Sequence, residues 1–166
     1  MLLSVAAFAQ TIAFNNFSLT LPQSAQKLDS KMVPSKVASI SSTGTSEISR
    51  MPSADIYSIN GSLARFWNVK MGSGQPVRSM EDVKSEMTGL YSLPSAYHLQ
   101  DISIKTVNGN KYLIIKYERD GGYYFHFLSD KVERQGLNGI LQYQKSNEND
   151  AVATLNQILS GITVKK

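Results

Sequence analysis

Histidine is the side chain best suited to acid–base and metal chemistry near neutral pH, and this sequence has two histidines, His98 and His126. His126 falls in the middle of an apolar, alternating segment, whereas His98 follows a proline-containing loop. A zinc site needs three or four ligands, and no group of His, Asp or Glu at ligand spacing accompanies either histidine. We therefore predict a hydrogen-bonded core histidine at 126, a surface loop histidine at 98, and no metal or other cofactor.

The other residues that could carry chemistry form no catalytic pattern. The absence of cysteine excludes disulfides, thiolate metal ligands and a cysteine nucleophile. No Gly-x-Ser-x-Gly segment occurs, and the Gly-Ser-Gly loop at 72–74 lacks the Gly-Lys-Ser/Thr ending of a phosphate-binding loop. The adjacent carboxylates Glu81 and Asp82 open a predicted helix, whose positive end favours them. We predict a protein that is not an enzyme; the alternative is a hydrolase with scattered residues around His126.

Aromatic side chains are the remaining candidates for binding. Trp67 lies in a predicted strand beside Phe66, so the two side chains point to opposite faces. Tyr112, Tyr123 and Phe125 share one face of a predicted hairpin. Helix packing over the sheet would account for these rings, and the alternative is an apolar cleft between sheet and helix, a usual place for small ligands. The candidate ligand-binding residues are Trp67, Tyr112, Tyr123 and Phe125.

A predicted block of antiparallel strands positions most of these residues. Asn-Gly at 108–109 and Asp-Gly at 120–121 supply the positive φ angles of tight hairpin turns and separate the strands 101–107, 111–118 and 123–128. In this register Ile104 faces Leu113, and Ile115 faces His126; a turn at 121–122 would shift the second pairing by two and keep the faces. Residues 137–143 add another strand. One face of this sheet is apolar, and the other face is apolar on the inner strands. This pattern predicts that other elements of the protein cover both faces of the sheet.

Two amphipathic helices are predicted to cover this sheet. One begins at Ser79, with Asp82 three residues later as a partial capping box. The closing helix is capped by Asn147 or Asn149. Its apolar stripe consists of Val152, Leu155, Ile158, Leu159 and Ile162. In the first half we predict strands over 17–21, 56–59 and 63–71. The Ser-rich segment 23–54 is predicted to be a loop with a short helix near 25–28 and a strand near 37–40.

The order of these elements resembles the PsbP-like family of α/β/α sandwich domains, which includes the Ran-binding Mog-type proteins and the DcrB-type bacterial envelope proteins. The residues that carry the resemblance are the segments 17–22, 112–117 and 153–162. The resemblance implies an α+β fold, with a largely antiparallel β-sheet flanked by helices, and a non-enzymatic binding or assembly role. The lipid anchor of the DcrB-type proteins does not carry over, because the chain has no cysteine.

Composition predicts one globular domain with a substantial core. The chain has 166 residues, of which 42% are hydrophobic, and its formal net charge is +4. The basic residues are spread singly, whereas a nucleic-acid-binding protein concentrates them on one face, so we predict no nucleic-acid partner. The alternative of attachment to an anionic surface would require one face that holds most of five lysines. These are Lys105, Lys111, Lys116, Lys131 and Lys145.

The N-terminus indicates export. Ala7-Phe8-Ala9 is a small-x-small cleavage site before Gln10, although the apolar run is short and lacks a basic start. We predict a truncated signal peptide over 1–9 and a single α+β domain over 10–166; the alternative is an apolar N-terminal segment packed on the domain. No stretch has the length of a membrane span. The predicted protein is a periplasmic or extracellular module of the bacterial envelope, whose partner is another envelope protein or a small apolar ligand.

Overall fold

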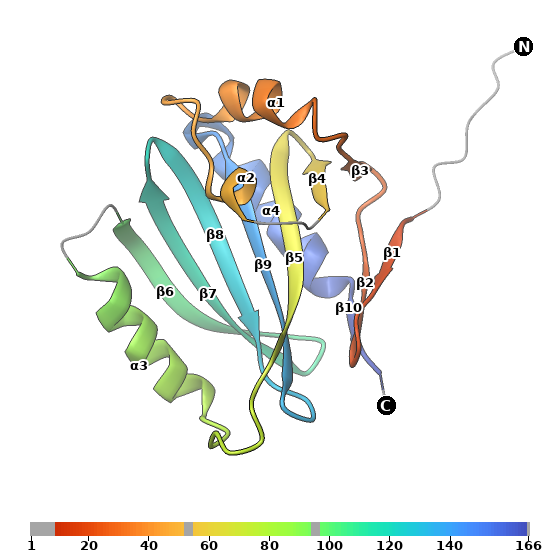
Figure 1. Ribbon diagram of the computed structural model, residues 1–166, viewed down its shortest axis with the longest axis vertical. Coiled ribbons are helices and arrows are strands. Elements are labelled where there is room, and N and C mark those ends of the chain that lie inside the picture. The colour runs from red at the N-terminus through yellow and green to blue at the C-terminus, as the bar shows by residue number, and fades with distance from the viewer. Residues whose placement is uncertain (1–8, 52–54, 94–96, 166) are drawn as a thin grey trace, which may run out of the picture.

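Antiparallel strands organise the computed structural model, which describes residues 9–51, 55–93 and 97–165. In these ranges the larger sheet has the strand order β3-β4-β5-β9-β8-β7-β6 and the smaller sheet the order β1-β2-β10 (Figure 1). The strands are β1 (Thr11–Ala13), β2 (Phe17–Thr20), β3 (Gln26–Lys27), β4 (Ile56–Ile59), β5 (Ser62–Lys70), β6 (Tyr97–Val107), β7 (Asn110–Arg119), β8 (Gly122–Ser129), β9 (Gln135–Tyr143) and β10 (Ile162–Val164). The helices are α1 (Val33–Ile40), α2 (Glu47–Arg50), α3 (Met80–Tyr91) and α4 (Glu148–Ser160), with a short 3₁₀ turn, η1 (Lys145–Asn147), before α4. The predicted signal peptide lies outside the described residues, apart from Ala9.

Helices cover both faces of the larger sheet. Helix α4 and the smaller sheet lie over one face, and α1, α2 and α3 lie over the other (Figure 1). The side chains alternate accordingly: Tyr112 and Phe125 pack towards α4, whereas Leu113 and Ile115 pack towards the other three helices. This arrangement confirms the predicted α+β fold, a largely antiparallel sheet flanked by helices.

The predicted turns and register are confirmed. Asn108 and Asp120 have φ angles of 51° and 49°, and the glycine after each also has a positive φ. Ile104 pairs with Leu113. Ile115 pairs with His126, so the second turn lies at 120–121 rather than at 121–122. The register places the His126 side chain on the face that α1, α2 and α3 cover.

Helix α3 begins at the predicted residue with a complete capping box. The Ser79 hydroxyl accepts a hydrogen bond from the backbone N–H of Asp82 at 3.1 Å, and the Asp82 carboxylate accepts one from the Ser79 N–H at 3.2 Å. Both of these N–H groups would otherwise lack an intrahelical partner. The side chains of Ser79 and Asp82 therefore determine where α3 begins.

The predicted core stripe of α4 is partly wrong. Val152 is 40% exposed, and Ile162, although buried in the core as predicted, belongs to β10 rather than to the helix. The buried face of α4 consists of Ala151, Thr154, Leu155, Ile158 and Leu159. Leu155, Ile158 and Leu159 are buried as predicted, and Ala151 and Thr154, rather than Val152, complete the buried face.

The segment 23–54 is more regular than predicted. A strand, β3, replaces the helix expected near 25–28, because Gln26 and Lys27 pair with β4. A helix, α1, replaces the strand expected near 37–40. Its buried residues Val33, Val37 and Ile40 recur at helical spacing, and Pro34 suits the first turn of a helix. The chain then crosses the sheet and forms α2.

Candidate functional site

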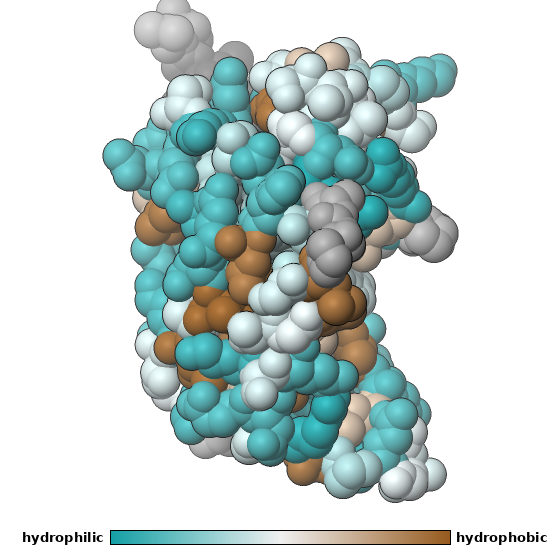
Figure 2. Space-filling model, turned by 90° about the vertical axis from the view of Figure 1, so that its left-hand side faces the viewer, coloured by the Kyte–Doolittle hydropathy of each residue, from teal (hydrophilic) through white to brown (hydrophobic). Residues whose placement is uncertain are grey.

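A pocket of about 290 Å³ lies between α2, α3 and the sheet face that carries His126. Helix α2 and the residue after it contribute Glu47, Arg50 and Met51, and α3 contributes Tyr91. The larger sheet contributes the rest of the lining, which consists of Trp67, Tyr117, Arg119, His126 and Ile140. Figure 2 shows the side of the molecule that carries α3 and β6, where apolar side chains gather among polar ones. The lining is mainly aromatic and apolar, with charged groups concentrated on α2 and Arg119.

Buried polar side chains hold α2, which is too short to be stable alone. The Ser46 hydroxyl accepts a hydrogen bond from the Ile48 N–H at 3.1 Å and donates one to the buried Gln142 side chain. The guanidinium of Arg65, on β5, donates to the carbonyl oxygens of Ile48 at 3.2 Å and Met51 at 2.6 Å. Arg65 is only 3% exposed. The sheet therefore fixes the wall of the pocket through both ends of α2.

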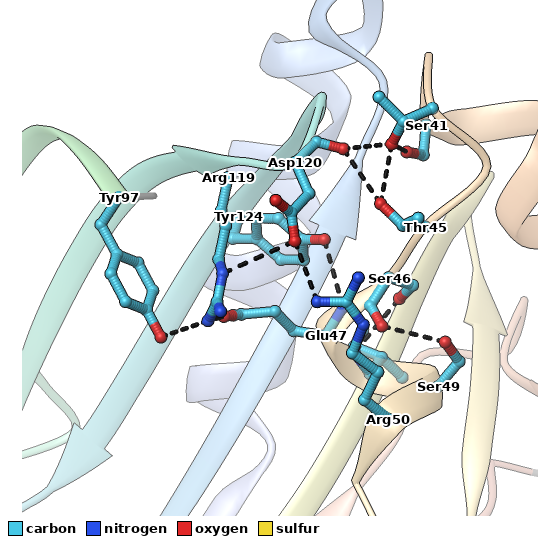
Figure 3. Close-up of polar contacts among 12 residues, drawn as sticks. Ser41, Thr45, Ser46, Glu47, Ser49, Arg50, Tyr97, Arg119, Asp120 and Tyr124 are labelled. Atoms are coloured by element: carbon cyan, nitrogen blue, oxygen red, sulfur yellow. Dashed lines mark hydrogen bonds and ion pairs between the residues drawn. The ribbon is translucent and has the colours of Figure 1, made fainter. Parts of the chain in front are cut away.

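The turn between β7 and β8 anchors the chain that leads into α2 (Figure 3). The hydroxyls of Thr43 and Thr45 donate to the Asp120 carbonyl oxygen. The Asp120 carboxylate accepts from Arg50 at 2.9 Å. Gly121 has a φ of 71°, and a Cβ there would lie 2.3 Å from the Ser42 hydroxyl oxygen. The positive φ, together with this close approach, favours glycine at 121.

The charged groups at this end of the pocket neutralise one another. The Glu47 carboxylate accepts hydrogen bonds from the Tyr117 hydroxyl and the Arg119 guanidinium. Arg119 also donates to the Tyr97 hydroxyl and lies over the Tyr97 ring, 4.4 Å from its centroid (Figure 3). Burial and the Glu47 carboxylate raise the pKa of Tyr117 far above its usual value, so this phenol is neutral. With Arg50 paired to Asp120, two acids balance two bases.

His126 occupies the apolar part of the pocket. Its Nδ1 lies 3.3 Å from the Tyr91 hydroxyl oxygen, and its ring centroid lies 5.7 Å from that of Trp67. Nε2 is buried and has no hydrogen-bond partner among the described residues. Burial lowers the pKa of His126 to about 4. At neutral pH the imidazole is therefore uncharged, with an N–H on one nitrogen and a lone pair on the other.

The structure divides the predicted ligand-binding residues between the two sheet faces. Trp67 lines the pocket beside His126. Tyr112 and Phe125 are 1% and 5% exposed in the core on the opposite face, where α4 packs. Tyr123 is half-buried on that face, with the Lys145 ammonium 5.4 Å from its ring centroid. Only Trp67 among the four lies at this pocket.

Several pocket residues are not predicted from the sequence, and the predicted loop position of His98 is wrong. The overlooked residues are Glu47, Arg50, Tyr91, Tyr117 and Arg119. Ser46 followed by Glu47 is a helix-start signal that could have located α2. Strand alternation places Tyr117 on the face of His126, but no local pattern brings Glu47 there. His98 lies in β6 opposite Glu118, not in a loop, and is exposed.

The alternative hydrolase would use His126 with a neighbouring carboxylate or tyrosine, and among the described residues the structure places Tyr91, but no hydrogen-bonded carboxylate, at His126. Glu47 lines the same pocket as His126, but its carboxylate binds Tyr117 and Arg119, while His126 contacts the Tyr91 hydroxyl. A histidine with a pKa near 4 is a weak general base at neutral pH. Among the lining residues that the structure describes, none is Ser, Thr or Cys. In the described ranges no three His, Asp or Glu side chains group together as metal ligands.

Solved structures with the same arrangement of elements include cyanobacterial PsbP (CyanoP) from Synechocystis sp. PCC 6803. Its solution structure superposes with a TM-score of 0.59 and 8% sequence identity, over 99% of this chain and 96% of that chain. The chain has the PsbP-like fold. A crystal structure from Bacteroides thetaiotaomicron matches with a TM-score of 0.50 and 9% identity, over 91% of this chain and 46% of that chain. The PsbP-like resemblance that the element order predicts is thus confirmed at the level of the fold.

Sequence comparison adds nothing to this fold assignment. No protein-family model matches the chain, and no curated protein matches it significantly. None of the helices in the described ranges combines the length and apolar character needed to cross a membrane.

Proposed function

We propose that this PsbP-like domain is an exported, non-enzymatic binding protein that takes a small, largely apolar ligand in the pocket under α2 and α3. The observation that carries this proposal is the composition of the pocket. Trp67, Met51, Tyr91 and Ile140 supply apolar and aromatic walls, and a few polar groups converge on the same space. This combination is typical of small-molecule sites in proteins.

The rigid support of the pocket favours a ligand-binding site over an incidental depression of the protein surface. Arg65, Ser46 and Gln142 are buried side chains that fix α2 above the sheet. A pre-formed site costs little ordering entropy when a ligand enters. The alternative surface, a lysine face, has weaker support, because Lys116 pairs with Glu148 at 2.6 Å.

A small-molecule screen followed by ¹H–¹⁵N NMR tests the proposed site. Trp67 is the only tryptophan in the chain, so its indole N–H is a single, resolved reporter inside the pocket. We expect hits to shift this signal and the amides of Tyr91 and Ile140. Ile140→Phe keeps the position apolar but fills space, and it should weaken binding about tenfold.

The control for this screen is Tyr123→Phe, on the opposite sheet face, which should bind as the wild type does. Shifts that gather around Tyr123 and α4 would contradict the proposed location. A screen without hits at Trp67 would contradict the proposed function.

Export is supported by the small-x-small triplet that ends at Ala9 and by the way the fold begins. The Gln10 carbonyl oxygen accepts a hydrogen bond from the Leu21 N–H at 2.8 Å, and β1 starts at Thr11. Cleavage after Ala9 would therefore leave every described strand intact. We expect N-terminal sequencing of the protein from its native cell to begin at Gln10. Cytoplasmic protein that retains Met1 would contradict this expectation.

A further inference from the structure

We infer that this protein forms a two-fold symmetric dimer in which the edge strand β6 pairs antiparallel with β6 of a second copy, centred on Ser103. The inference goes beyond the proposed ligand pocket and does not depend on it. Two observations lead to it: β6 is a long, unpaired sheet edge, and its sequence is complementary to itself.

The outer side of β6 is a free sheet edge. Strand β6 is the last strand of the larger sheet, with β7 on one side and, in the part of the chain that the structure describes, no strand on the other (Figure 1). It has 11 residues, whereas the other edge strands of the two sheets, β1, β3 and β10, have 3, 2 and 3. A short edge strand offers little to a pairing partner, but a long one is a template for another strand. Among the described strands, β6 is therefore the sheet edge best suited to pair with a second chain.

The hairpin turn determines which backbone groups of β6 point outwards. The two-residue turn at 108–109 makes its flanking residues a hydrogen-bonded pair, and such pairs alternate with non-hydrogen-bonded pairs along an antiparallel ladder. Ser103 therefore bonds to β7, whereas Ile102 and Ile104 direct their N–H and C=O groups away from β7. None of the other described residues forms a hydrogen bond with these outward groups.

The sequence of β6 selects one register for the pairing of two copies. When the two-fold axis passes through Ser103, Asp101 of each copy lies opposite Lys105 of the other. The same register brings the outward backbone groups of Ile102 opposite those of Ile104, so each of these pairs can exchange two hydrogen bonds. A shift of the axis by one residue in either direction places uncharged residues opposite Lys105. The opposite charges therefore specify the register.

Both charged side chains are available for this contact. Asp101 and Lys105 are exposed, and neither has an ion-pair partner among the described residues. Lys105 Nζ donates to the neutral Asn156 side chain at 2.6 Å, and the Asp101 carboxylate accepts from the Ser103 hydroxyl at 3.1 Å. In the dimer Asp101 and Lys105 form a non-hydrogen-bonded pair, whose side chains lie closer together than those of a hydrogen-bonded pair. Opposite charges directly across a ladder stabilise it.

On the other face of β6 the pairing buries apolar side chains. Ile102 and Ile104 are half-buried and pack against the same core cluster as Val83 and Met87 of α3. Figure 2 shows apolar side chains at the surface on the side of the molecule that carries β6 and α3. An axis perpendicular to the sheet keeps each face on its own side, so four isoleucines meet around it. They lose part of their remaining exposure to water, which favours association.

A β-bulge limits the length of the dimer ladder. The register of β6 on β7 shifts between Leu99 and Asp101. A bulge disrupts regular pairing and protects that part of an edge from further strands. The regular ladder between the two copies therefore spans 101–105, which is the self-complementary segment and has the usual length of a strand, about five residues.

Charge reversal in the full chain tests the register, with the dissociation constant measured by sedimentation from micromolar to millimolar concentration. We expect Asp101→Lys and Lys105→Asp each to weaken dimerisation about tenfold, because two attractive pairs become two repulsive pairs. The double variant Asp101→Lys/Lys105→Asp should recover the wild-type dissociation constant, since it restores opposite charges. Lys70→Asp is the matched control: Lys70 is exposed on β5, away from the edge, so this reversal should leave dimerisation unchanged.

A disulfide across the axis tests the same register independently. The chain has no cysteine, so Ser103→Cys introduces its only thiol. Directly opposed residues of a non-hydrogen-bonded pair have Cα atoms about 4.5 Å apart, within the range of a disulfide. We expect oxidation to link the two copies. Thr106→Cys is the control, because Thr106 is more exposed than Ser103 but its two copies lie about 20 Å apart in the dimer, so cross-linking should be much slower.

Amide hydrogen exchange of the wild type decides the inference if a variant fails to fold. The Ile102 and Ile104 N–H groups should become protected at concentrations where the dimer forms, and should exchange rapidly in the monomer. A wild-type protein that stays monomeric up to millimolar concentration overturns the inference. A dimer that single charge reversal does not weaken, that the double variant does not restore, or that Thr106→Cys cross-links as fast as Ser103→Cys also overturns it. None of these outcomes affects the ligand pocket, which the screen with the Trp67 signal tests separately.

Discussion

Leu155→Ala is expected to lower the free energy of unfolding by about 2–5 kcal/mol, the range for truncating a large core side chain. Leu155 lies at the centre of the buried face of α4 and is 5% exposed. It belongs to the same core cluster as Phe125 and Leu141 of the larger sheet. Truncation leaves a cavity between helix and sheet that neither layer can close without losing other contacts. Since a domain of this kind is stable by about 5–15 kcal/mol, the loss is a large fraction of the total.

Val152→Ala on the same helix is the matched control. Val152 is 40% exposed, so its truncation should change the free energy of unfolding by no more than about 0.5 kcal/mol. Urea denaturation followed by circular dichroism measures both variants. Equal losses in the two variants, or a larger loss for Val152→Ala, would mean that α4 presents a different face to the sheet.

The hairpins could be predicted because their signals are local. Asn108 and Asp120 have the positive φ angles that Asn-Gly and Asp-Gly turns require, and each turn sets the register of the strands beside it. Alternation along β7 then assigns every side chain to a face. The Ser79 capping box is equally local, since donor and acceptor are three residues apart.

The errors concern elements that tertiary packing decides. The apolar run near 37–40 is short and contains β-branched residues, so its composition favours a strand. It becomes α1 because Val33, Val37 and Ile40 find a sheet face to cover. In α4 the helical spacing of Leu155, Ile158 and Leu159 predicts the buried face correctly. Small Ala151 and polar Thr154 complete that face, and hydrophobicity alone does not identify them.

The site was predictable only in part, for the same reason. Strand parity and turn register place Trp67 and His126 on sheet faces from the sequence alone. The contacts of Glu47 with Tyr117 and Arg119 join residues 70 and 72 positions apart. They depend on how the segment 41–46 crosses the β7–β8 turn. No sequence pattern within a single helix or strand predicts that path of the chain.

Acidification from about pH 7.5 to about pH 5 is expected to lower the free energy of unfolding by about 2 kcal/mol through His126. Burial lowers the pKa of this histidine from 6.5 to about 4 in the folded protein. Below about pH 6.5 His126 therefore binds a proton in the unfolded chain, whereas in the folded chain it stays neutral down to about pH 4. The unfolded state holds more protons in this window, so stability falls as the pH falls. Above about pH 6.5 both states are neutral at His126, and the effect disappears.

Urea unfolding of the wild type and two variants at these pH values measures the effect. His126→Phe keeps a planar ring but cannot titrate, so its stability should lose about 2 kcal/mol less than that of the wild type over the same interval. His98→Gln should retain the full wild-type loss, because His98 is exposed. Carboxylates contribute little in this range, since their unfolded pKa values lie near 4. A wild-type stability that stays constant down to about pH 5, or a loss that His98→Gln abolishes, would show that His126 is not buried as a neutral ring. The charged side chains of the pocket lining are paired, Glu47 with Arg119 and Arg50 with Asp120, so none of the described lining residues offers a free carboxylate to an imidazolium there.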